Sequence, residues 1–94
     1  EALGFCSLDI SNRPFLVFNG EFTNQMIGEY DTCLTEEFFR AFAVNAGITL
    51  HVNMVYGKND HHKCESVFKA VAHALKMAVK ETGSGETLST KGGL

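Results

Sequence analysis

The sequence predicts one small α+β domain, a two-layer sandwich with two helices on one face of a mainly antiparallel sheet. Its 94 residues suffice for a single core. Apolar residues make up 45% of the chain and include eight Phe, enough for a core of modest size. The expected elements follow the order strand, strand, helix, strand, helix, which is typical of helices packed on one side of a sheet.

The first two expected elements are strands joined by a turn. Residues 3–10 alternate between apolar and polar side chains, as in a strand with one buried face. Residues 11–14 (Ser-Asn-Arg-Pro) have the composition of a turn, and Asn12 tolerates the left-handed backbone that a tight turn can require. Residues 15–22 read as the second strand, so we expect a hairpin. Residues 23–30 indicate a loop or a short edge strand.

A helix and a third strand follow. The helix spans residues 33–46, with Asp31 or Thr32 as its N-cap and Gly47 as its C-terminal stop. Its helically spaced residues are Leu34, Phe38, Ala41, Phe42 and Asn45. The third strand alternates cleanly, and one of its faces consists of Ile48, Leu50, Val52, Met54 and Tyr56.

The second helix is longer. It runs from His61 to about Glu81, with Asp60 as its N-cap. Its apolar stripe consists of Cys64, Val67, Phe68, Val71, Ala72, Leu75, Ala78 and Val79. Residues 83–85 (Gly-Ser-Gly) are expected to link this helix flexibly to the C-terminal residues.

Charge and hydropathy argue against two classes of partner. The net charge is −3 and the isoelectric point is near 5.7, whereas a general nucleic-acid surface shows a basic excess. No apolar run approaches the roughly 20 residues that span a bilayer, and no signal peptide is visible. Cys6, Cys33 and Cys64 read as reduced thiols. We therefore expect a cytoplasmic protein with no nucleic-acid partner and no membrane partner.

The most informative stretch is His61-His62-Lys63-Cys64-Glu65. Two imidazoles and a carboxylate so close together can hold transition-metal ions. Residues four apart share a helix face, so His61 and Glu65 point the same way, while His62 diverges by about 100°. One motif can thus serve two metal ions. Taken alone, the motif also fits a pair of surface histidines.

Glu37 is a further candidate ligand. On the first helix it shares a face with Leu34, Ala41 and Val44. A carboxylate beside apolar neighbours is costly unless it is paired or coordinated. The alternative is an edge position whose carboxylate reaches water.

Several further motifs surround the His pair in order. They are Asp9-Ile-Ser-Asn-Arg13-Pro14, Asp31-Thr32 leading into Glu36-Glu37-Phe38-Phe39-Arg40, Ala46-Gly47-Ile48-Thr49-Leu50-His51-Val52, and Ser89-Thr90-Lys91-Gly92. From about Leu8 to Leu94, the chain resembles the C-terminal half of the imidazoleglycerol-phosphate dehydratases, a family of histidine-biosynthesis enzymes. The resemblance implies a fold like the second domain of a small-subunit ribosomal protein. It also implies that residues 1–94 are the second of two tandem halves, and that the N-terminal half is absent from this chain.

The resemblance assigns a metal site. It implies two Mn²⁺ ions per complete site, with Glu37, His61, His62 and Glu65 as the ligands from this chain. Further ligands would come from the other half and from neighbouring subunits. Many members of the family have His where Glu37 stands, and a carboxylate oxygen can replace an imidazole nitrogen on a hard ion such as Mn²⁺. The resemblance implies that Glu65 is first a metal ligand, and it assigns Glu65 as the catalytic residue of this chain.

The resemblance also maps Arg13, Lys69, Ser89 and Lys91 onto the phosphate-binding set of the family. Lys69 lies four residues beyond Glu65 and so shares its side of the helix. Ser89 and Lys91 lie in a glycine-flanked tail that can donate hydrogen bonds to a phosphate. The planar guanidinium of Arg13 can bind a phosphate through two hydrogen bonds.

The function that the resemblance implies is manganese-dependent dehydration of imidazole glycerol phosphate, a small phosphate substrate, to imidazole acetol phosphate. It also implies a homo-oligomer of 24 subunits with sites at the subunit interfaces. The competing hypothesis is a non-catalytic metal-binding or assembly module, which would have no need of the phosphate-binding set. By itself, we expect this half to fold marginally or to self-associate, because its core is small.

Overall fold

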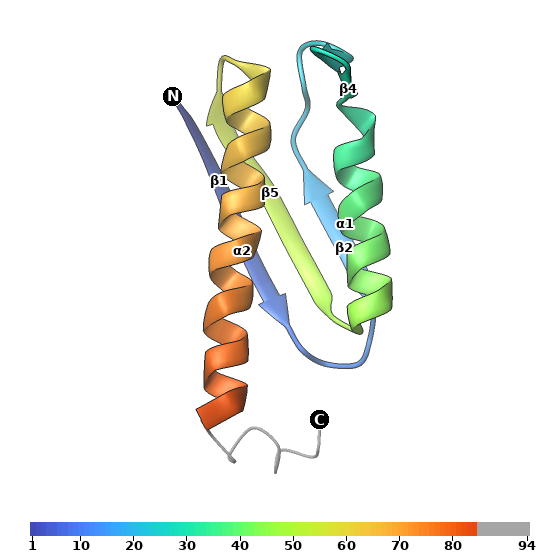
Figure 1. Cartoon of the computed structure of the whole chain (residues 1–94), viewed down its shortest axis with the longest axis vertical. Coiled ribbons are helices and arrows are strands. Elements are labelled where there is room, and N and C mark those ends of the chain that lie inside the picture. The colour runs from blue at the N-terminus through green and yellow to red at the C-terminus, as the bar shows by residue number, and fades with distance from the viewer. Residues whose placement is uncertain (85–94) are drawn as a thin grey trace.

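The computed structural model describes the backbone of residues 1–84 and the side chains of residues 1–80, and it has two layers (Figure 1). A three-stranded sheet forms one layer, and two helices cover one face of it. The elements are β1 (Ala2–Asp9), β2 (Phe15–Asn19), β3 (Met26–Ile27), β4 (Tyr30–Asp31), α1 (Cys33–Ala46), β5 (Thr49–Gly57) and α2 (Asp60–Ser84). The predicted fold class is confirmed. The short strands β3 and β4 form a separate two-stranded ladder before α1.

The sheet is mixed, and β5 is its central strand, between β1 and β2. All eight residues of β1 pair antiparallel with β5, and the five residues of β2 pair parallel with it. The antiparallel ladder is therefore the longer one. The predicted hairpin is wrong, because β1 and β2 are not neighbours.

The turn between β1 and β2 shows why these strands do not pair with each other. Its backbone binds the residues that lead into β5: the Asn12 N–H donates to the Gly47 carbonyl at 2.8 Å, and the Phe15 N–H donates to the Ile48 carbonyl at 3.1 Å. Asn12 takes up the left-handed conformation that its residue type allows, with φ of 60°. The chain thus passes around the end of β5, and β2 lies on the opposite side of that strand from β1.

Both ends of α1 lie where the sequence predicts them. Gly47 ends the helix in a left-handed conformation, with φ of 68°. At the other end, the Asp31 carboxylate accepts a hydrogen bond from the Cys33 N–H at 3.0 Å. The Thr32 hydroxyl instead donates to carbonyls of the preceding loop. Of the two predicted caps, Asp31 therefore supplies the side-chain oxygen.

The buried face of α1 differs from the predicted one. Thr35 and Phe39 are fully buried, whereas Leu34 is 46% exposed and Phe38 is 53% exposed. Thr35 can occupy a core position because its hydroxyl shares a 2.6 Å hydrogen bond with the Tyr30 hydroxyl. Phe38 and Phe39 are adjacent and equally apolar, so spacing alone cannot decide which of them faces the sheet.

The central strand supplies the middle of the core. Leu50 and Val52 have no exposed surface, and Ile48, just before β5, is 2% exposed, as the alternation predicts. Phe39 of α1 and Val67 of α2 belong to the same cluster. Burying side chains of this size contributes about 1.5–3 kcal/mol each.

The helix α2 packs mainly on β1 through the first half of its predicted apolar stripe. Val67 and Val71 are buried, whereas Val79, near its C-terminal end, is 55% exposed. The helix includes Gly83 and Ser84, so its predicted end near Glu81 and the predicted flexible link lie too early in the chain. Within residues 1–84, neither helix is apolar and long enough to cross a membrane.

Apolar side chains remain exposed on the face of the sheet opposite the helices, as far as residues 1–84 are concerned. The odd-numbered residues of β1 and β2, and those of β5 as far as Asn53, point away from the helices, because successive strand residues alternate between faces. Among them, Leu3, Phe5 and Phe15 are 45–59% exposed. A bulge in the ladder shifts the alternation near the end of β5, so Tyr56 lies opposite Leu3 and is 60% exposed, although the sequence predicts it on the buried face. Large apolar side chains exposed on one face of a sheet are typical of surfaces that another protein layer covers.

Candidate functional site

The His pair lies at the start of α2, and Asn59 rather than Asp60 caps this helix. The side-chain oxygen of Asn59 accepts a hydrogen bond from the His62 N–H at 3.1 Å, and its carbonyl accepts one from the Lys63 N–H at 2.9 Å. These bonds satisfy N–H groups that a helix start leaves without an internal partner. The prediction of Asp60 as N-cap is wrong, because its carboxylate binds a different segment.

His61, His62 and Glu65 are exposed on the first turns of α2. The two imidazole rings have centroids 5.9 Å apart and planes inclined by 68°, so they face different directions. Among the described residues, no hydrogen bond or ion pair engages these three side chains. Their nitrogen and oxygen lone pairs are therefore open to a ligand from outside the described chain.

The described residues do not form a complete metal site by themselves. In the part of the chain that the structure covers, no three His, Cys, Asp or Glu side chains are grouped so that they could hold a metal ion. The donors at the start of α2 suit Mn²⁺ in kind, since it accepts both carboxylate oxygen and imidazole nitrogen. They do not suffice in number. A metal site here would need further ligands from outside residues 1–84 or from another chain.

Glu37 is exposed on α1, the other helix. Its neighbours Leu34 and Val44 on that face are 46% and 57% exposed. The carboxylate therefore reaches water, and the burial argument for coordination does not hold within this chain. The structure does not group Glu37 with the His pair in a cluster of three ligands. Its assignment as a ligand stays a prediction that rests on the family resemblance.

Arg13 lies at the opposite end of the sheet from the His pair. Its carbonyl accepts a hydrogen bond from the Thr49 hydroxyl at 2.9 Å, and Thr49 is the first residue of β5. The helix α2 begins just after Gly57, the last residue of β5, at the far end of that strand in Figure 1. At about 3.3 Å per residue, β5 separates its two ends by roughly 26 Å. One chain therefore does not bring Arg13 and His61 to one small substrate.

The other predicted phosphate-binding residues lie on or beyond α2. Lys69 is exposed, one turn beyond Glu65. At 1.5 Å per residue, it lies about 12 Å along the helix axis from His61. Ser89 and Lys91 fall outside the described residues, so their assignment stays a prediction.

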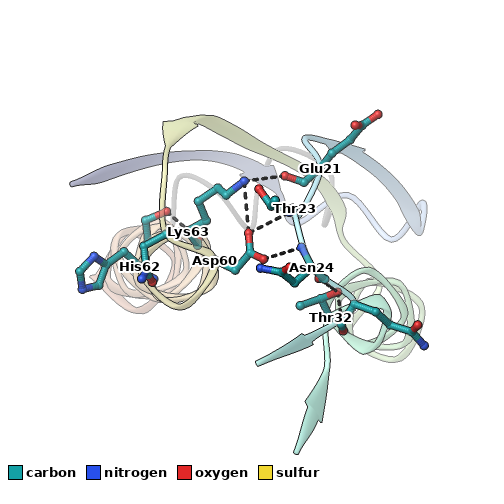
Figure 2. Close-up of polar contacts among 10 residues, drawn as sticks. Glu21, Thr23, Asn24, Thr32, Asp60, His62 and Lys63 are labelled. Atoms are coloured by element: carbon teal, nitrogen blue, oxygen red, sulfur yellow. Dashed lines mark hydrogen bonds and ion pairs between the residues drawn. The ribbon is translucent and has the colours of Figure 1, made fainter. Parts of the chain in front are cut away.

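A polar cluster around a buried ion pair, which sequence analysis missed, lies directly beside the His pair (Figure 2). The two carboxylate oxygens of Asp60 accept hydrogen bonds from the Thr23 N–H at 2.9 Å and the Asn24 N–H at 2.7 Å. The Lys63 ammonium lies 3.4 Å from Asp60 and donates to the Glu21 carbonyl at 2.9 Å. The Asp60 and Lys63 side chains are 5% and 9% exposed. We call these five residues the helix-start clamp.

The clamp favours the charged form of Asp60. The N–H groups of Thr23 and Asn24 and the Lys63 ammonium together lower the pKa of Asp60, against the effect of its burial. Figure 2 shows the clamp joining the start of α2 to the loop that contains Glu21, Thr23 and Asn24. The His62 ring points away from it, on the other side of the helix. The only local signal for the clamp was an Asp three residues before a Lys, which is common on exposed helices.

An open cleft of about 620 Å³ lies beside His62. Its other lining residues are Glu1, Tyr56, Gly57, Lys58 and Asn59. A larger groove of about 730 Å³ runs between β1 and α2, but none of the predicted site residues lines it. We therefore place the candidate site at the start of α2, where this cleft lies beside His62.

Comparison with known proteins decides the family. A family model described as imidazoleglycerol-phosphate dehydratase matches residues 1–75. The chain belongs to this family. A protein of that name from Clostridium kluyveri is 59% identical over 93 residues, which cover 98% of this chain and 48% of that protein. The corresponding protein from Lactococcus lactis subsp. cremoris is also 59% identical, and the match covers 98% of this chain and 47% of that protein.

A solved structure agrees with the assignment. The crystal structure of imidazoleglycerol-phosphate dehydratase from Staphylococcus aureus superposes with a TM-score of 0.77 at 45% sequence identity. The match covers 80% of this chain and 44% of that one. The chain thus spans about half the length of the curated dehydratases that it matches.

Proposed function

We propose that this chain forms one half of an imidazoleglycerol-phosphate dehydratase, a hydro-lyase of histidine biosynthesis. The complete enzyme would convert imidazole glycerol phosphate to imidazole acetol phosphate and water. The observation that carries the proposal is the start of α2, where His61, His62 and Glu65 are exposed and open to ligands. The names of relatives that are 59% identical to this chain support the reaction.

The proposed cofactor is Mn²⁺, two ions per complete site, held on this chain by Glu37, His61, His62 and Glu65. When bound, the ions would supply Lewis acidity, which the reaction needs because the proton to be removed lies on a carbon with no adjacent carbonyl. His61 and Glu65 present their donors on one helix face, and His62 presents its nitrogen in another direction. Glu65 is also the catalytic residue that we propose in this chain.

The substrate phosphate would be bound by Arg13, Lys69, Ser89 and Lys91. Lys69 lies on α2 with His61, His62 and Glu65, but Arg13 lies roughly 26 Å from the start of that helix along β5. We infer that Arg13 of one copy serves the His pair of another, so that each substrate contacts two chains. A phosphate held far from the reacting carbon orients the substrate and reduces the entropy lost on the way to the transition state.

The uncovered apolar surfaces support a larger assembly. Phe5 and Phe15 are 57% and 59% exposed on the outer face of the sheet, and Phe38 is 53% exposed on α1. A companion N-terminal half and further subunits, 24 in the complete homo-oligomer, would cover these faces. The net charge of −3 argues against a nucleic-acid partner. The match to a family of biosynthetic enzymes supports the proposed cytoplasmic location.

The test is native mass spectrometry of the chain together with its companion half, with and without Mn²⁺, followed by an assay of dehydration. We expect a complex of about 24 subunits with about two metal ions per complete site, and turnover of imidazole glycerol phosphate. Metal binding without turnover would contradict the enzymatic proposal and favour a non-catalytic metal-binding module. Absence of metal binding would contradict the ligand assignments.

The matched variants are His61→Ala, His62→Ala and His73→Ala. We expect the first two to lose bound Mn²⁺ and to lower activity by about 100-fold or more, since changes to outer-shell partners alone cost 10- to 100-fold. His73 is an exposed histidine farther along α2 and serves as the control. Equal losses in all three variants would show that the effect does not come from ligation at the start of the helix.

A further inference from the structure

The helix-start clamp buries an ion pair within one turn of exposed side chains. Asp60 is 5% exposed and Lys63 is 9% exposed. Their neighbours His61 and His62 are both exposed. Burying two charges costs free energy that their attraction only partly returns, and apolar residues of similar size would often stabilise a fold as well. A buried pair at this place is better explained by the single arrangement that it imposes on the start of the helix.

The clamp leaves the first turn of α2 little freedom to rotate. Each oxygen of Asp60 accepts one backbone N–H, from Thr23 and Asn24 in turn. Lys63 reaches the Glu21 carbonyl at 2.9 Å, so the loop is held at three backbone positions. Any rotation of this turn would break several of these part-buried bonds and leave the buried charges of Asp60 and Lys63 without partners, which is costly.

The loop held by the clamp is also bonded to the start of α1. The Thr32 hydroxyl donates to the carbonyls of Asn24 and Gln25 at 3.0 Å and 2.9 Å. The Thr32 N–H donates to the Gln25 carbonyl at 2.7 Å. Thr32 directly precedes α1, the helix that carries Glu37. A continuous series of hydrogen bonds therefore connects the starts of the two helices that carry the proposed ligands.

The residue Gly57 makes room for the clamp. A Cβ atom at this position would lie 2.6 Å from the Lys63 Cγ and 2.8 Å from the Ala2 Cβ. Real Cβ atoms do not approach other carbons so closely, so a side chain here would displace the Lys63 stem. This packing observation is independent of the hydrogen bonds, and it shows that the path of Lys63 into the clamp is closely confined.

We propose that Asp60 and Lys63 are positioning residues of the dehydratase site. They hold the start of α2 against the loop and, through Thr32, against α1, so that the ligands on the two helices keep one fixed separation. The inference rests on the proposed function, because it assigns the clamp a role toward the metal ligands. Outer-shell groups that orient metal ligands have this effect in many metal sites.

The experiment uses the chain together with its companion half and compares three variants. Asp60→Asn removes one charge of the pair and weakens the hydrogen bonds with the Thr23 and Asn24 N–H groups. Asp60→Asn/Lys63→Met removes both charges, so that no buried charge is left unpaired and stability recovers. Val71→Ala creates a small cavity under α2, where Val71 is 6% exposed, and serves as a destabilised control with an intact clamp. The readouts are Mn²⁺ affinity by calorimetry, melting temperature, kcat and KM, and exchange of the Thr23 and Asn24 amide protons.

In the double variant we expect a melting temperature near that of the wild type, faster amide exchange at Thr23 and Asn24, and Mn²⁺ affinity weaker by about 10-fold. We expect kcat to fall with KM little changed. Val71→Ala should lower the melting temperature and leave Mn²⁺ affinity unchanged.

Wild-type Mn²⁺ affinity in the double variant would overturn the positioning role while leaving the proposed function intact. Unchanged amide exchange in Asp60→Asn would overturn the clamp itself. A wild-type protein that binds no Mn²⁺ would overturn the proposed function and, with it, the positioning role. Equal loss of Mn²⁺ affinity in Val71→Ala would show that lower stability, rather than positioning, weakens the site.

Discussion

Two ion pairs near helix starts differ in both separation and burial: the closer pair is exposed, and the wider pair is buried. Glu36 and Arg40 on α1 approach to 3.0 Å, but their side chains are 47% and 55% exposed. Asp60 and Lys63 on α2 are 3.4 Å apart, and their side chains are 5% and 9% exposed. Water screens the closer pair, whereas the wider pair lies where an unpaired charge would be costly. The comparison shows that burial, more than separation, decides how strongly this fold depends on an ion pair.

The largest expected effect comes from breaking the buried pair. In the assembled protein, Lys63→Met should lower the free energy of unfolding by about 3 kcal/mol, near the lower limit for breaking a buried pair, because Asp60 keeps two N–H donors. Urea denaturation measures the loss. Lys76→Met, which removes an exposed lysine of the same helix, is the control and should change stability by about 0.5 kcal/mol or less. Similar losses in both variants would contradict the comparison.

A somewhat smaller effect is expected where the clamp meets its tightest packing. Gly57→Ala forces a Cβ against the Lys63 Cγ, at 2.6 Å, and should cost about 1–3 kcal/mol. In a Lys63→Ala background the Cγ is absent, so Gly57→Ala should cost measurably less there. A double-mutant cycle from thermal melts gives the coupling between the two positions. If the stability losses of Gly57→Ala and Lys63→Ala add fully in the double variant, the Lys63 side chain does not confine position 57.

An acid titration tests Asp31, a carboxylate that hydrogen bonds rather than an ion pair hold in place. Hydrogen bonds from the Cys33 thiol and N–H and from the Gln25 amide lower the pKa of Asp31 below its ordinary value of 3.8. The charged form therefore stabilises the fold above that ordinary value, and the contribution is lost as the pH falls through the lowered pKa of the folded state. Asn caps a helix nearly as well as Asp.

The melting temperature of Asp31→Asn should therefore fall only slightly below that of the wild type at neutral pH. The difference between the two proteins should vanish in strong acid. Melts recorded between about pH 2 and pH 7 test this expectation. A difference that grows toward low pH would have the wrong sign.

The smallest effect is expected at the exposed pair. Glu36→Gln should lower the free energy of unfolding by about 0.3–0.5 kcal/mol, because both side chains are about half exposed and solvent screens their attraction. Denaturation at low salt and at about 1 M salt separates the electrostatic part, which high salt removes. A loss as large as that of Lys63→Met would refute the ranking by burial.

Local signals in the sequence predicted most of the elements. Gly47 ends α1, Asn12 adopts the left-handed turn, and the alternation of Ile48, Leu50 and Val52 identifies the buried face of the central strand. These features depend on a residue's own backbone preference or on its spacing along one element, so neighbouring residues are sufficient to indicate them. The exposed His61-His62 pair belongs to the same class, because its position at a helix start follows from nearby residues.

Pairings between distant segments could not be predicted in this way. The expected hairpin failed because residues 12 and 15 bind the residues that lead into β5, which are more than 30 positions away in the sequence. The exposed face of α1 was misassigned because Phe38 and Phe39 differ only in what they meet in three dimensions. Local sequence predicts Asp60 as a cap because its actual partners, Thr23 and Asn24, lie 37 and 36 residues earlier in the chain.

The sequence by itself therefore determined the order of the main helices and strands and the His pair at a helix start, which depend on residue identity and short-range spacing. Its resemblance to a known family supplied the full set of candidate ligands. Only the tertiary structure decided that β5 is central, that Arg13 lies at the far end of the sheet from the His pair, and that a buried ion pair holds the start of α2. The physical reason is that burial and long-range hydrogen bonds depend on which distant segments pack together. Local conformational propensity carries little information about those contacts.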